Sequence, residues 1–68
     1  MLPTADILIK NCRRASGLSQ AKVAKKMGAH PAQISTWEQG IHEPSFNNVV
    51  DCLAAMGFRL KLARLDDE

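Results

Sequence analysis

The chain has 68 residues, a mass of 7.5 kDa and a formal net charge of +2, and 46% of its residues are hydrophobic and 24% charged. These values are typical of one small folded domain and exclude a second hydrophobic core, a disordered chain and an enzyme that carries its own cofactor cleft. No apolar run approaches the roughly 18 residues of a membrane-spanning helix, and no signal-peptide pattern is present, so we expect a cytoplasmic, nucleoid-associated protein with no membrane partner.

The charge is distributed unevenly along the chain. Residues 1–40 contain six basic and two acidic side chains, a balance of +4, whereas residues 41–68 contain three basic and five acidic ones, a balance of −2. This split indicates that the N-terminal part faces a polyanion. Solvated helix faces are the alternative, because basic runs are common on protein surfaces.

Two helices are predicted in the first half of the chain. Apolar residues recur at helical spacing over about 4–16, where Thr4 can cap the start and Gly17 ends the pattern. A second, shorter helix is expected over 19–27, and Gly28 closes it. A helix this short needs packing against the rest of the domain to be stable.

Two further helices follow. The third is expected over 30–39, since Pro31 suits the first helical position, where its missing N–H costs nothing. The fourth is expected over 45–56, capped by Ser45, and has the widest apolar stripe in the chain.

After Gly57 the apolar period changes from 3.6 to 2, which predicts a short strand over 58–65. A single strand cannot satisfy its own backbone groups, so the expected partner is the same strand of a second subunit. The dimerisation residues would be Phe58, Leu60 and Leu62. A frayed fifth helix or a disordered tail is the alternative, and residues 66–68 form an acidic tail.

The sequence indicates no metal, cofactor or reaction. Cys12 and Cys52 lie 40 positions apart, and we expect both to be reduced and buried. Together with His30 and His42 they show no metal-ligand spacing. The predicted helices and strand do not bring together a nucleophile and a base, or two carboxylates. We therefore expect no enzyme activity.

The two short helices over 19–27 and 30–39, joined by a turn that contains glycine, have the layout of a DNA-binding helix-turn-helix. The run LSQAKVAKKMGAHPAQISTWEQG, with Pro-Ser following at 44–45, resembles the phage-repressor (Xre or Cro type) helix-turn-helix family. The matching residues, in order, are Ser19-Gln20, Ala24, Gly28, Ile34-Ser35, Trp37-Glu38, Gly40 and Pro44-Ser45. The resemblance covers about residues 8–57 and implies an all-α, four-helix, lambda-repressor-like DNA-binding domain over 1–57.

Helical geometry divides the third helix into two faces. At 100° per residue, Ile34 and Trp37 fall on the core side, whereas Ala32, Ser35 and Thr36 fall on the opposite side. This outward face is the one that would enter the major groove of DNA.

Candidate DNA contacts follow from the residue types on and around that face. Ala32, Gln33 and Thr36 would read base edges, because glutamine suits adenine while threonine and alanine can pack on a thymine methyl. Candidate phosphate contacts are Gln20, Lys22, Lys26, Ser35, His30 and Arg14. The role of Gln20 is implied by the resemblance, and a plain helix cap is the alternative for His30. The third helix begins with His-Pro-Ala, where a longer polar side chain could contact the base edges. We therefore expect DNA shape to contribute to specificity.

The resemblance also implies a structural ion pair between Arg13 and Glu38. The guanidinium group of arginine can donate two parallel hydrogen bonds to the two oxygens of a carboxylate. The segment over 57–62 is similar to the dimerising strand of the HipB-type antitoxins, which neutralise serine/threonine-kinase toxins. This likeness implies a homodimer that binds an inverted-repeat operator, represses its own operon and holds a kinase toxin inactive.

Two alternatives to the antitoxin remain open. One is a stand-alone phage-type transcriptional regulator. The other is a protein-interaction module with a vestigial helix-turn-helix, favoured by the absence of Lys and Arg over 30–39 and opposed by the basic helix over 19–27.

Overall fold

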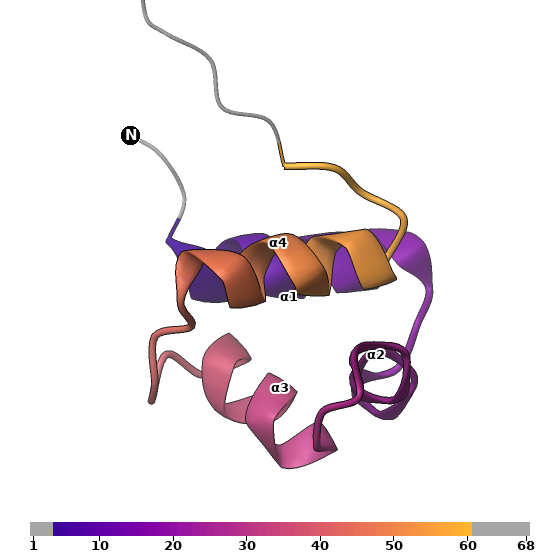
Figure 1. The fold of residues 1–68 in the computed structure, drawn as a ribbon. Coiled ribbons are helices and arrows are strands. Elements are labelled where there is room, and N and C mark those ends of the chain that lie inside the picture. Colours follow the sequence, from indigo (N-terminus) through magenta and orange to yellow (C-terminus); the bar gives the residue numbers. More distant parts are fainter. Residues whose placement is uncertain (1–3, 61–68) are drawn as a thin grey trace, which may run out of the picture.

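The structure is a computed structural model that describes residues 4–60, and within them the chain forms four helices (Figure 1). They are α1 (Ala5–Ser16), α2 (Gln20–Met27), α3 (Pro31–Glu38) and α4 (Phe46–Ala55). The predicted all-α fold is therefore confirmed, and each helix lies inside its predicted range. None of these helices has the length and apolarity that crossing a membrane requires.

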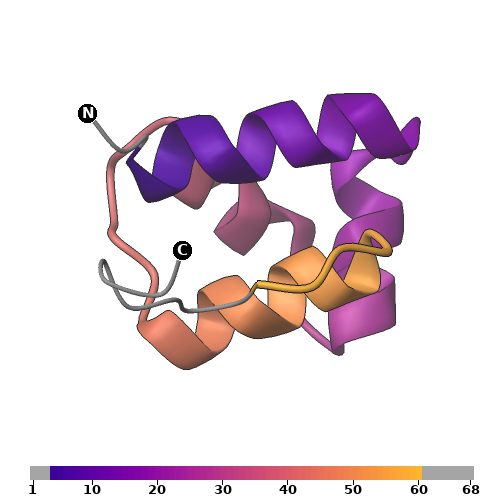
Figure 2. The same ribbon diagram turned by 90° about the horizontal axis from the view of Figure 1, so that it is seen from above.

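The four helices form two layers. α1 and α4 run side by side in one layer, and α2 and α3 lie on the other side of the core (Figures 1 and 2). α3 packs against α1 and α2, and α4 packs against α1 and α2. The side of α3 that faces away from α1 is therefore left at the surface.

Serine side chains begin two of the helices. The Ser19 hydroxyl accepts a hydrogen bond from the backbone N–H of Lys22 at 3.1 Å, and the Ser45 hydroxyl accepts one from Asn48 at 3.2 Å. Each bond satisfies one of the N–H groups that a helix leaves unpaired at its start. Thr4 makes no such bond, because its hydroxyl donates to the carboxylate of Asp6 instead.

The end of α3 is closed by a Schellman motif, in which the chain reverses at a glycine. Gly40 has a φ of +74°, in the left-handed region where a side chain would be strained. Beyond it, the N–H of Ile41 donates to the carbonyl of Thr36 at 3.0 Å. The same backbone bond closes α2, from Ala29 to Ala24, and α4, from Phe58 to Leu53.

One hydrophobic core joins all four helices. Its buried residues are Ile9, Val23, Ala24, Ile34, Trp37, Val49, Cys52, Leu53 and Met56. Ile34 is fully buried and Trp37 is 4% exposed, so the inner face of α3 is fixed by packing. This packing sets the direction in which the opposite face of α3 points.

Residues 58–60 follow α4 without regular secondary structure. Phe58 remains 41% exposed, whereas Leu60 packs against the core of its own subunit. The rest of the predicted 58–65 strand, including Leu62, and the acidic tail lie outside the described residues. The strand and its pairing between subunits therefore stay predictions.

Candidate nucleic-acid interface

The outward face of α3 is accessible and uncharged. Ala32 and Gln33 are exposed, and Ser35 and Thr36 are half-exposed. The acidic residue of α3, Glu38, is only 5% exposed and points into the domain. The structure thus gathers the predicted base-reading residues on one open helix face.

Hydrogen bonds fix the two hydroxyl groups of this face. The Thr36 hydroxyl donates to the carbonyl of Gln33 at 2.8 Å. The Ser35 hydroxyl accepts from the side-chain amide of Gln39 at 2.7 Å. Ser35 therefore keeps its proton for an external acceptor such as a phosphate oxygen, whereas Thr36 has committed its own to the helix backbone.

Gln39 is an exposed residue of this face that the sequence reasoning missed. It caps the end of α3 and follows Ala32 by seven residues, or two helical turns, so both lie on the same side. This periodicity was the signal that could have identified it. Its carbonyl oxygen and second N–H are available to a ligand.

Gln20 connects the start of α2 to the end of α3. Its side-chain Nε2 donates to Glu38 Oε1 at 3.2 Å, and the residue is half-buried. The amide has a second N–H and a carbonyl oxygen for an outside partner. The predicted phosphate contact would therefore be made by a side chain that the domain already holds in place.

Arg13 and Glu38 form a two-pronged ion pair between α1 and α3. Arg13 Nε lies 2.6 Å from Glu38 Oε2, and Nη2 donates to Oε1 at 3.1 Å. The third guanidinium nitrogen, Nη1, donates to the carbonyl of Leu18 in the connection between α1 and α2. The pair thus ties together the three helices that surround the interface.

The protonation of this pair follows from its surroundings. Burial alone would raise the pKa of Glu38, but the hydrogen bonds from Arg13 and Gln20, together with the Arg13 charge, lower it below its ordinary value. The hydrogen bond to Glu38 raises the pKa of Arg13. Both groups are charged near neutral pH, and neither lies on the outward face of α3.

The remaining candidate phosphate contacts lie on α2, at the end of α1 and at the start of α3. Lys22 and Lys26 are exposed one helical turn apart on α2, and Arg14 is exposed in the last turn of α1. His30 is exposed at the start of α3, where its side chain makes no capping hydrogen bond. The lysine and arginine side chains among them therefore lie on α2 and α1 rather than on the outward face of α3, and α2 carries no acidic residue to oppose them.

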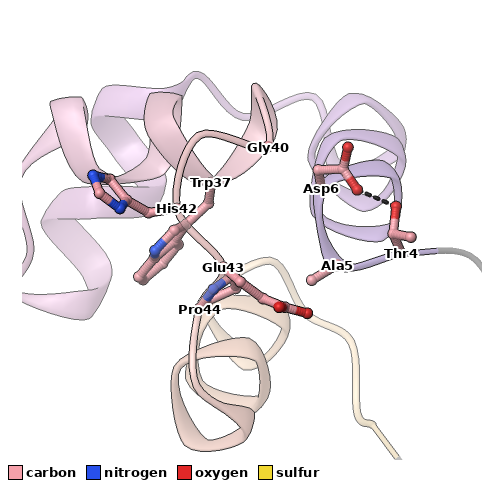
Figure 3. Close-up of a pocket in the computed structure, with 8 residues that line it drawn as sticks. All are labelled: Thr4, Ala5, Asp6, Trp37, Gly40, His42, Glu43 and Pro44. Carbon is pink, nitrogen blue, oxygen red and sulfur yellow. Dashed lines mark hydrogen bonds between the residues drawn. The ribbon is translucent and has the colours of Figure 1, made fainter.

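A cleft of about 280 Å³ lies away from this face, between the start of α1 and the segment that joins α3 to α4. Figure 3 shows Trp37, His42 and Pro44 on one side of it and Thr4 and Asp6 on the other. Among residues 4–60, no group of three or more His, Cys, Asp or Glu side chains is placed to hold a metal ion. The cleft therefore lies beside the core, where it borders the buried Trp37.

Comparison with known proteins agrees with this geometry. A family model described as helix-turn-helix matches residues 9–62, which include α2, α3 and the turn between them. No curated protein and no solved structure matches the chain significantly. The match covers most of the chain and confirms the resemblance of its motifs to the Xre and Cro type. The chain therefore belongs to the helix-turn-helix family of the Xre and lambda-repressor type, a family of DNA-binding transcriptional regulators.

Proposed function

We propose that the chain is a transcriptional repressor that binds a specific double-stranded operator through the outward face of α3. The observation that carries this proposal is the division of α3 into a buried inner face and an open, uncharged outer face. Ile34 and Trp37 anchor the helix, so Ala32 and Thr36 are presented on a rigid support. A helix held in this way is suited to the major groove, which admits one α-helix.

Base reading and backbone binding would be performed by different residues. Gln33 carries the amide that can pair with adenine, and Thr36 contacts a neighbouring base. The positive charge comes from α2, where Lys22 and Lys26 would bind phosphates, with Gln20, Ser35, His30 and Arg14 as further contacts. Phosphate contacts position the protein on the duplex, whereas base contacts choose the sequence.

The working unit is proposed to be a homodimer. A single α3 of eight residues reads only a few base pairs, whereas two copies related by a two-fold axis would read half-sites about 34 Å apart. The operator would then be an inverted repeat. Phe58 and Leu60, with Leu62 beyond the described residues, are the proposed dimer contacts.

A stand-alone regulator needs no partner other than DNA and a second copy of the chain. The antitoxin role and its kinase-toxin partner rest on the likeness of residues 57–62 to a dimerising strand, part of which lies outside the described residues. A protein-interaction module with a vestigial helix-turn-helix is disfavoured by the exposed lysines of α2. The antitoxin role therefore stays a prediction from the sequence.

The test is selection of duplexes from a random pool with the full chain, followed by binding titrations over a range of salt concentrations. We expect one enriched inverted repeat, and Lys22→Ala should reduce the slope of log K against log salt by about 0.9 per subunit, or about 1.8 for the homodimer, without changing base preference. Arg59→Ala is the matched control, because the 57–60 segment runs on the side of α4 away from α2 and α3 (Figure 1) and the change keeps the proposed dimer contacts Phe58 and Leu60. Its salt slope should equal that of the parent chain. Failure to enrich any sequence, or a slope near zero, would show that the proposed function is wrong.

A further inference from the structure

The outward face of α3 lacks the side chains that read guanine most often. Arginine and lysine make the commonest specific contacts to guanine in the major groove. Neither residue occurs between His30 and Gln39. The charges that this domain offers to DNA lie on α2 and α1, where phosphates are their natural partners.

Thr36 offers its methyl group more readily than its hydroxyl proton. That proton is committed to the carbonyl of Gln33 at 2.8 Å, a bond that turns Oγ1 back onto the helix. While this bond holds, Thr36 cannot donate to guanine O6 or thymine O4. The half-exposed side chain then presents its methyl group and the lone pairs of its oxygen.

Ile41 extends this apolar surface beyond the end of α3. It is 61% exposed, the largest exposed fraction among the large hydrophobic residues described. Its N–H donates to the carbonyl of Thr36 in the Schellman motif, so its backbone lies against the last turn of α3, and an apolar residue at this position of the motif commonly packs toward the residue that accepts the bond. Ala32 precedes Thr36 by one helical turn on the same face. The three residues thus follow one another as a strip of methyl groups.

We propose that this methyl strip, Ala32, Thr36 and Ile41, reads the C5-methyl groups of thymines in the major groove, so that each operator half-site is rich in A·T pairs beneath α3. Thymine is the base that presents an apolar group in that groove. The amides of Gln33 and Gln39 flank the strip and suit adenine, the partner of thymine. This inference rests on the proposed function and specifies which base pairs the operator contains.

The experiment replaces thymine by deoxyuracil, one position at a time, in the duplex that the full chain selects. Deoxyuracil lacks only the C5-methyl group, so base pairing and backbone charge are unchanged. We expect the affinity to fall about fourfold for each methyl group in contact with the strip. The salt slope should stay the same, since no phosphate contact is lost.

Variants locate the effect on the protein. Thr36→Ser removes one methyl and keeps the hydroxyl, and Ile41→Ala truncates an exposed side chain, so the fold should tolerate both. Each should abolish the discrimination between thymine and uracil at one position of each half-site. Ile7→Ala is the matched control, because Ile7 is 49% exposed but lies on α1. It should keep the full discrimination.

The possible failures are distinguishable. If the chain selects a duplex but binds thymine and uracil equally at every position, or selects guanine beneath α3, the methyl strip is wrong and the proposed function stands. If no duplex is selected, the proposed function is wrong and this inference fails with it. The deoxyuracil series uses the parent chain, so its result does not depend on the folding of any variant.

Discussion

Glu38 at the end of α3 is bound on two sides, and its principal partner is Arg13 of α1. Arg13 Nε lies 2.6 Å from Glu38 Oε2, while Gln20 of α2 donates to Oε1 at 3.2 Å. One buried carboxylate therefore connects the three helices that position the candidate interface. A charge taken out of water is tolerated only when it is paired in this way.

Glu38→Ala should strongly destabilise the domain. The change leaves the Arg13 guanidinium without its carboxylate and removes the acceptor of the Gln20 amide. We expect a loss of about 2–3 kcal/mol in the free energy of unfolding, measured by urea denaturation. The value lies below the usual cost of breaking a buried pair because the Arg13 side chain is 19% exposed. Glu43→Ala, at an exposed glutamate, should change stability by less than about 0.5 kcal/mol. Equal effects of the two changes would show that the ion pair contributes little.

Acid should weaken the domain through the same carboxylate. The pKa of Glu38 is lowered in the folded state, so its contribution to stability is complete above the unfolded value of about 4.3 and is lost as pH falls through the folded value. The free energy of unfolding should therefore decline below about pH 5. Glu38→Gln, which cannot ionise, should show a flatter decline over the same range.

Asp6 provides an internal check on this pH series. The hydrogen bond from Thr4 lowers the pKa of Asp6 as well, so it also favours the folded state at neutral pH. Because Asp6 is present in both the parent chain and Glu38→Gln, its contribution cancels when the two pH curves are subtracted. A difference that does not vary with pH would contradict the assignment to Glu38.

Local signals were sufficient to predict the helices. Two kinds of residue mark the helix bounds, serines at the starts of α2 and α4 and glycines at the ends of the helices. They act through hydrogen bonds within a few residues, so the sequence predicts the helix bounds without the tertiary structure. Thr4 shows the limit of such signals. Its hydroxyl donates to the nearby carboxylate of Asp6 and does not accept a hydrogen bond from the helix backbone. The residue type alone does not determine which of these two bonds forms.

The finer organisation of the interface depends on how the helices meet. The bonds from Gln20 to Glu38 and from Gln39 to Ser35 require side-chain rotamers that only packing fixes. The exposed position of Ile41 likewise depends on the reversal at Gly40. Leu60 shows the same limit, since a period of two cannot tell whether an apolar side chain contacts its own core or a second subunit.

The two cysteines should differ in reactivity. Burial, followed by the nearby charges of Glu38 and Cys12, raises the pKa of Cys52 to about 11, whereas Cys12 is only half-buried. Iodoacetamide at pH 8 should therefore modify Cys12 first, and Cys52 only when urea unfolds the domain. Mass spectrometry of digested samples separates the two sites. Equal rates in the folded chain would mean that α4 opens frequently.

The chain end provides the sharpest test of dimerisation. Truncation after Leu60 removes residues 61–68 but keeps the bond from Phe58 to Leu53 and the packing of Leu60 on the core. Truncation after Gly57 would remove both and would confuse a loss of folding with a loss of pairing.

Light scattering should give twice the 7.5 kDa subunit mass for the full chain and a monomer for the form ending at Leu60, with unchanged helical circular dichroism. Loss of the dimer without loss of helix would show that the dimer requires residues 61–68, because every interaction of the described fold is still present. A truncated chain that stays dimeric would place the contact within residues 4–60, where Val50, Ala54 and Phe58 line a groove of about 460 Å³ beside α4. The hypothesis that the dimer requires the part of the strand beyond Leu60, including Leu62, would then be wrong. A full chain that is monomeric both alone and on its selected duplex would instead contradict the homodimer itself, and the operator would be expected to contain a single half-site.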